Sequence, residues 1–190
     1  MLNQKISFFI KSNKQIIYFI VKVLIIFIIW KTFQWILGEE KIPVDNRLIP
    51  IVSECWEHFN DYIRIFLLKS VALFFKLLGY KSIILFNYEL HVIGLSAIAI
   101  GNYCIGIQLW VYFMALIISY YGKWKIKLLF ITIGIICINI INIFRQIGLI
   151  FAFHYFPKYM NFNHDYIFNG IVYIFTFTMF YIWIKFYSKK

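Results

Sequence analysis

The sequence is poor in the residues that build disulfide frameworks, metal sites and carboxylate active centres. Its 190 residues include three cysteines, four histidines and eight acidic residues. Three scattered cysteines are too few for a disulfide framework. The acidic residues gather mainly in one stretch without an evident partner, so a catalytic carboxylate pair is not expected, and nothing in the sequence calls for a cofactor. No two histidines are four residues apart, which argues against a metal site built from Cys55 or Cys104 with His58, His91, His154 and His164.

Charged residues are scarce altogether, and apolar residues take their place. Only 14% of the residues are charged, whereas 63% are hydrophobic, well above the roughly half that is typical of soluble proteins. Long apolar runs indicate an integral membrane protein, and the length suits a single membrane domain over residues 1–190. The net charge of +11 comes from basic residues that lie mostly between the apolar runs. We therefore expect this charge to meet membrane lipid and to set orientation, and we expect no nucleic-acid partner.

Four segments predict transmembrane helices, at about 20 apolar residues per crossing: residues 16–37, 103–121, 128–150 and 166–184. The expected fold is thus an all-α integral membrane protein. Basic residues precede the first segment, fill the loop between the second and third, and end the chain. An even number of crossings puts all of them on one side, which the positive-inside rule makes cytoplasmic for both termini.

Residues 38–101 then lie outside, and they predict structure of their own. An amphipathic helix is expected over 61–78, because Lys69 and Lys76 share one helical face while apolar residues fill much of the remainder. Residues 82–100 contain two short apolar runs around a polar turn, which predicts a small β-hairpin. The alternative is two further crossings at 62–78 and 83–100. Because this alternative adds two crossings, it leaves Cys104 on the same side.

Three polar residues at the ends of apolar helices are predicted to lie at one membrane depth: Cys104, Arg145 and His164. Arg145 follows Lys127 by eighteen residues, which is about 27 Å of helix and nearly the hydrocarbon thickness. Asn139, Asn142 and Arg145 follow one another at three-residue spacings and share a face that should point into the helix bundle. A thiol, a cation and an imidazole at one membrane face suggest a nucleophile, an oxyanion partner and a base. Asn142 would hold Arg145, and Asn163 or Asp165 would orient the imidazole.

These residues stand in short motifs that resemble the exosortase/archaeosortase family of membrane-embedded cysteine transpeptidases. The matching pieces are Asn-Tyr-Cys-Ile-Gly-Ile at 102–107, Asn-Ile-Phe-Arg at 142–145 and Asn-His-Asp at 163–165. The resemblance covers about residues 79–190, and the small size is similar to the short exosortase forms of Bacteroidetes. It carries the family's Cys, Arg and His to Cys104, Arg145 and His164. Ile105 departs from the family's usual small polar residue between Cys and Gly.

The resemblance implies an enzyme of the bacterial cytoplasmic (inner) membrane, with its active site facing outward. Its substrates would be exported proteins that end in a short motif, a transmembrane helix and a basic tail. The enzyme would cut near the motif and pass the acyl group to an envelope acceptor, a lipid or a glycan. The alternative is a non-catalytic membrane adaptor or envelope assembly factor that binds a partner through residues 38–101.

Overall fold

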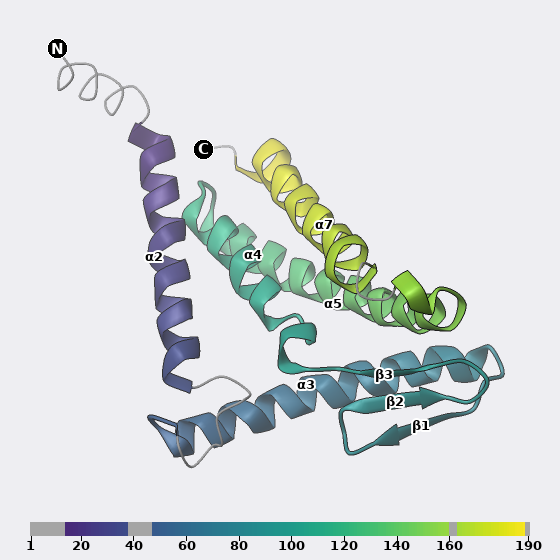
Figure 1. Cartoon of the computed structure of the whole chain (residues 1–190). Coiled ribbons are helices and arrows are strands. Elements are labelled where there is room, and N and C mark those ends of the chain that lie inside the picture. The colour runs from purple at the N-terminus through teal and green to yellow at the C-terminus, as the bar shows by residue number, and fades with distance from the viewer. Residues whose placement is uncertain (1–13, 38–46, 160–162, 189–190) are drawn as a thin grey trace.

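The computed structural model describes residues 14–37, 47–159 and 163–188, except for the side chains of residues 163–165. The chain is mainly helical and carries one small antiparallel sheet (Figure 1). The expected fold class is confirmed. In chain order the elements are α2 (Lys14–Leu37), α3 (Pro50–Leu77), β1 (Ser82–Leu85), β2 (Glu89–Val92), β3 (Ala97–Ala99), the 3₁₀ turn η2 (Asn102–Cys104), α4 (Ile107–Ser119), α5 (Trp124–Tyr155), the 3₁₀ turn η3 (Pro157–Tyr159), the π-helical turn η4 (Asn163–Phe168), α7 (Asn169–Ile182) and the π-helical turn η5 (Trp183–Tyr187).

Three helices among the described residues are long and apolar enough to cross a membrane. They are Lys14–Leu37, Trp124–Tyr155 and the continuous stretch Tyr166–Tyr187. They correspond to the segments predicted at 16–37, 128–150 and 166–184. In α2 no residue of the apolar window is buried, as suits a helix that faces lipid around most of its circumference. The N-terminal lysines that helped to predict the orientation (Lys5 and Lys11) lie outside the described residues.

Helix α4 is shorter than the crossing predicted at 103–121. It has 13 residues, or about 20 Å of helix, against a hydrocarbon core of about 30 Å. The difference arises at its N-terminus, where Gly106 has a left-handed φ of +91° and separates α4 from the turn η2. The sequence does not reveal this break, because Tyr103 and Ile105 belong to the same apolar run as the residues of α4 that follow Gly106.

Helix α3 is the amphipathic helix expected at 61–78, but it begins eleven residues earlier, at Pro50. Proline suits the first turn of a helix, where its fixed φ fits and its missing N–H has no partner to lose. One face of the C-terminal half is fully buried and consists of Leu67, Leu68, Val71 and Phe75. This face covers the sheet and part of α5.

The predicted hairpin is present as β1 and β2, and β3 adds a third strand to it. Ser82 pairs with Val92, and Leu90 pairs with Ile98 on the other side of β2. The hairpin turn places Phe86 and Asn87 at φ +50° and +62°, the pattern of a type I′ turn. Because these residues form strands, the alternative of a transmembrane helix over 83–100 is not supported. Strand β3 leads directly into the turn that carries Cys104.

Two apolar clusters hold the helices together, and Cys104 packs against the first of them. One joins α3, the sheet and the C-terminal half of α5, and the other joins α4, the N-terminal half of α5 and η5. At the far end of α4, Lys127 is buried and donates to the carbonyl oxygens of Ile118, at 2.9 Å, and Tyr120. A cation there offsets the negative end of the helix dipole. The loop between α4 and α5 is thereby fixed at the opposite end of these helices from Cys104.

Candidate active site

Cys104 lies in a short turn that joins the sheet to α4. At the end of the turn, Cys104 N donates to Gly101 O at 2.9 Å. Cys104 is half-buried and is not part of a disulfide.

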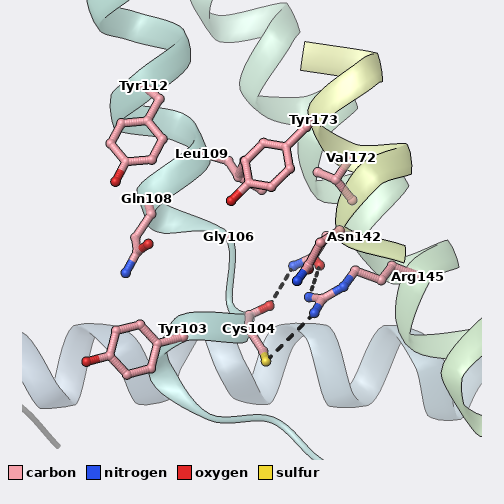
Figure 2. A pocket seen from close by; sticks show the side chains of 11 residues that line it. Tyr103, Cys104, Gly106, Gln108, Leu109, Tyr112, Asn142, Arg145, Val172 and Tyr173 are labelled. Carbon is pink, nitrogen blue, oxygen red and sulfur yellow. Dashed lines mark hydrogen bonds between the residues drawn. The ribbon is translucent and has the colours of Figure 1, made fainter. Parts of the chain in front are cut away.

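Helix α5 supplies the groups that face this turn, from two residues on one helical face. Asn142 and Arg145 are 1% and 8% exposed. Asn142 Nδ2 donates to Cys104 O at 3.0 Å, and Arg145 Nη1 lies 3.4 Å from Asn142 Oδ1. Arg145 Nη2 lies 4.0 Å from Cys104 Sγ (Figure 2). The structure thus brings the predicted cation to the predicted thiol, with the predicted supporting asparagine in contact with both residues.

Asn139, one turn earlier on α5, does not take part. Its Nδ2 donates at 2.9 Å to Ile135 O of its own helix. Of the three polar residues predicted to share this face, Asn142 and Arg145 contact Cys104, whereas Asn139 bonds within α5.

Gly106 allows Asn142 to approach the turn. A Cβ at this position would lie 3.2 Å from Asn142 Nδ2, and the left-handed φ of +91° disfavours any L side chain. The glycine two residues after the cysteine, part of the motif at 102–107, is thus required for two independent reasons.

We expect Gly106→Ala to lower activity about tenfold or more, because the added methyl group pushes Asn142 away from Cys104 O at a strained backbone position. Gly79→Ala is the matched control, since Gly79 has a similar φ of +87° with nothing within 4 Å of its added Cβ. Both variants should be compared as turnover per folded protein. Equal activity of the two variants would show that the contact with Asn142 is unimportant.

A cavity of about 190 Å³ opens beside Cys104 between the turn and helices α4, α5 and α7. Its walls carry polar groups that the sequence reasoning did not single out: Gln108, Tyr112, Asn169 and Tyr173. In Figure 2 the hydroxyl groups of Tyr112 and Tyr173 point toward the Cys104 end of the cavity. Gln108 and Tyr112, like Asn169 and Tyr173, are four residues apart, so an i, i+4 search for polar pairs in the apolar helices would have found them. The cavity offers a thiol, a guanidinium and several hydrogen-bonding groups in one space.

His164, Asn163 and Asp165 have their backbone in η4, whereas their side chains lie outside the described part of the chain. Turn η4 packs against α5. Its Phe168 lies over Gly148, where an added Cβ would come within 2.4 Å of the ring. Gly148 is three residues beyond Arg145, so η4 is held at the same end of α5 as the arginine.

The remaining histidines and acidic residues show no metal centre in the described ranges. No three His, Cys, Asp or Glu side chains there gather closely enough to hold an ion. His91 instead lies 3.0 Å from Glu89 Oε2 in the sheet. His58 lies 3.9 Å from Glu54 on the exposed side of α3.

Comparison with known proteins gives one family. No curated protein and no solved structure shows significant similarity to the chain. A family model described as transmembrane exosortase matches residues 46–184, well over half of the sequence. The match includes the Cys104 turn, Asn142, Arg145 and η4, and it begins before α3, some thirty residues earlier than the resemblance in the sequence motifs. The chain therefore belongs to the transmembrane exosortase family.

Proposed function

We propose that the chain is a membrane-embedded cysteine peptidase or transpeptidase that cleaves the C-terminal sorting signals of exported proteins. The observation that carries this proposal is the Arg145 guanidinium 4.0 Å from the Cys104 thiol, at the edge of a cavity large enough for part of a peptide. Membership of the exosortase family supports the same reaction class.

In the proposed reaction, Cys104 Sγ attacks the carbonyl carbon of the scissile peptide bond, and His164 takes the thiol proton. Arg145 stabilises the thiolate before the attack and the oxyanion after it. The C–N bond then breaks, His164 returns the proton to the leaving amine, and a thioester remains on Cys104. An acceptor nucleophile, or water, releases the acyl group and regenerates the thiol. Asn163 or Asp165 orients the imidazole.

Asn142 positions both partners in this scheme. Its amide nitrogen holds the backbone of Cys104, and its amide oxygen lies 3.4 Å from Arg145 Nη1. Arginine suits the role because its planar fork of donors can address the asparagine and the thiol at once, and it stays charged when partly desolvated.

We place the site at the outward face of the bacterial cytoplasmic membrane, with both termini in the cytoplasm. In support, the basic loop that contains Lys123 lies at the opposite end of α4 from Cys104. A short α4 would leave the Cys104 turn recessed from the outer membrane surface, where the junction between a substrate's motif and its transmembrane helix could reach it. The acyl acceptor is proposed to be an envelope lipid or glycan.

The test is co-expression with an exported protein that ends in a motif, a transmembrane helix and a basic tail, followed by intact mass spectrometry. We expect the tail to be lost only when the chain is present, and the mass of the new C-terminus separates transfer from hydrolysis. On such a substrate, His164→Ala should stall cleavage. If tails persist on every such protein encoded near this chain, the adaptor function is favoured instead.

A further inference from the structure

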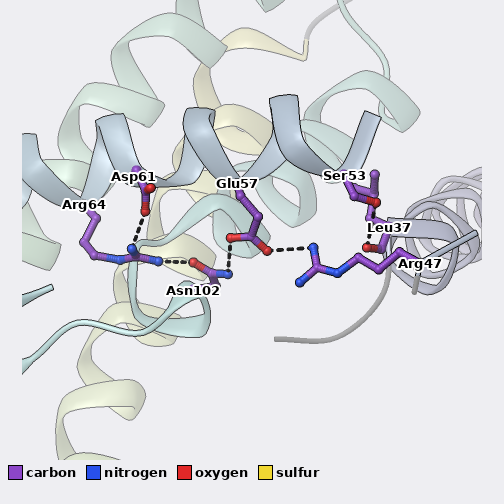
Figure 3. A network of polar contacts seen from close by, with 7 residues as sticks. All are labelled: Leu37, Arg47, Ser53, Glu57, Asp61, Arg64 and Asn102. Atoms are coloured by element: carbon purple, nitrogen blue, oxygen red, sulfur yellow. Dashed lines mark hydrogen bonds and ion pairs between the residues drawn. The ribbon is translucent and has the colours of Figure 1, made fainter. Parts of the chain in front are cut away.

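A network of charged side chains on α3 reaches the Cys104 turn from the side opposite α5. Glu57 accepts from Arg47 Nη1 at 2.8 Å through Oε1 and from Asn102 Nδ2 at 3.1 Å through Oε2. Arg64 donates to the Oδ1 atoms of Asn102 and Asp61 (Figure 3). Two cations and two anions therefore meet around one neutral amide, and that amide belongs to the first residue of η2.

The α3 members of the network lie on the helical face that is fully buried farther along α3. Glu57, Asp61 and Arg64 follow one another at spacings of four and three, and the same face continues with Leu68 and Val71, which are fully buried. This face is therefore charged in the part of the helix that contacts Asn102 and apolar in the part that follows. Side chains of a solvated face would not share one helical face with the buried core residues.

The burial of the two cations makes the arrangement specific. The side chains of Arg47 and Arg64 are only 3% and 12% exposed, whereas those of their partners Glu57 and Asp61 are 26% and 43% exposed. Buried ions destabilise a fold unless their partners have good geometry, so such groups define one arrangement more sharply than apolar contacts do. Hydrogen bonds to charged groups are also stronger than neutral ones, and both ends of the Asn102 amide make them.

Asn102 is two residues before Cys104, and Asn142 holds Cys104 O from the other side. The turn is therefore clamped between α3 and α5, whereas Arg145 is carried by α5 alone. We propose that Asn102, held by Glu57 and Arg64, is a positioning residue that sets the Cys104 thiol against Arg145. The catalytic part of this inference rests on the proposed function, and its geometric part does not.

Reversal of one hydrogen bond tests the inference. Asn102→Asp places a carboxylate against Glu57, so the turn should move and turnover should fall at least tenfold with KM little changed. Adding Glu57→Gln restores a donor–acceptor pair with the roles exchanged, since the new amide donates to the new carboxylate, and Arg64 keeps an acceptor. We expect the double variant to recover to within about threefold of the wild type. Glu54→Gln is the matched control, because Glu54 is 68% exposed on the same helix.

A second readout needs no substrate. In purified protein with Cys55→Ala and Cys137→Ala, the rate of alkylation of the remaining Cys104 thiol reports its surroundings directly. This rate should change at least threefold in Asn102→Asp, return in the double variant and stay constant in Glu54→Gln. An unchanged rate and turnover in folded Asn102→Asp, or a double variant no better than Asn102→Asp, would overturn the inference. If no substrate is ever cut, the alkylation series still decides the geometric part separately from the proposed function.

Discussion

Cys104→Ala is expected to leave tail-bearing substrates uncut, whereas Cys55→Ala and Cys137→Ala should process them at the wild-type rate. The three variants make the same change, each at a cysteine that forms no disulfide. Only Cys104 lines the cavity beside Arg145, so only its loss removes the nucleophile. The fraction of substrate that loses its tail in membranes, followed over time on gels, gives the comparison.

Cys104→Ser sharpens the result, since a hydroxyl group can replace the thiol sterically but is a weaker nucleophile and cannot form a thioester. It should retain the fold and lose at least 10³-fold in rate, within the range that loss of a nucleophile costs. Normal processing in membranes that contain folded Cys104→Ala would remove the thiol from the mechanism and favour the adaptor function.

Arg145→Ala is expected to lower kcat/KM by about 10²–10³-fold, the usual cost of losing an oxyanion partner. Arg145→Lys should recover only part of this loss. A lysine ammonium is a single point of charge, whereas the guanidinium addresses Asn142 Oδ1 through Nη1 and Cys104 Sγ through Nη2. Steady-state kinetics on a cleaved substrate would measure both variants. The control is Lys158→Ala, which removes an exposed cation from η3, just after the end of α5.

The two arginine variants also separate chemistry from fold. Because Arg145 is 8% exposed, its removal affects local packing as well as charge. The amount of folded protein should therefore be measured alongside activity. Equal activity in Arg145→Lys and wild type would mean that charge alone suffices and that the forked geometry is irrelevant.

The approach of Arg145 to Cys104 could be expected from the sequence because it depends on the regular geometry of α-helices. Helix rise fixes the height of Arg145 above Lys127, and helix periodicity puts Asn142 and Arg145 on one face. The hairpin before the cysteine was predictable in the same way, from two apolar runs around a polar turn.

Other features arise from contacts between distant residues and could not be expected. The role of the charged residues on α3 becomes evident only in the folded chain, where Asn102, 45 residues after Glu57, contacts them. The shortness of α4 depends on the left-handed conformation of Gly106 inside an apolar run. The extension of α3 back to Pro50 was hidden by the polar residues that follow it, which resemble a loop when their buried partners are unknown.

The most direct test of Cys104 as the nucleophile is a search for a covalent intermediate on its thiol. Wild-type protein and a cleavable substrate would be mixed, quenched in acid and digested, and the cysteine peptides would be mapped by mass spectrometry with and without hydroxylamine. Nucleophilic catalysis by Cys104 predicts that the N-terminal part of the substrate is attached to the peptide that contains Cys104 and is released by hydroxylamine, as a thioester requires. Cleavage without any such adduct under conditions that trap other thioesters, or an adduct on Cys55 or Cys137 instead, would contradict it.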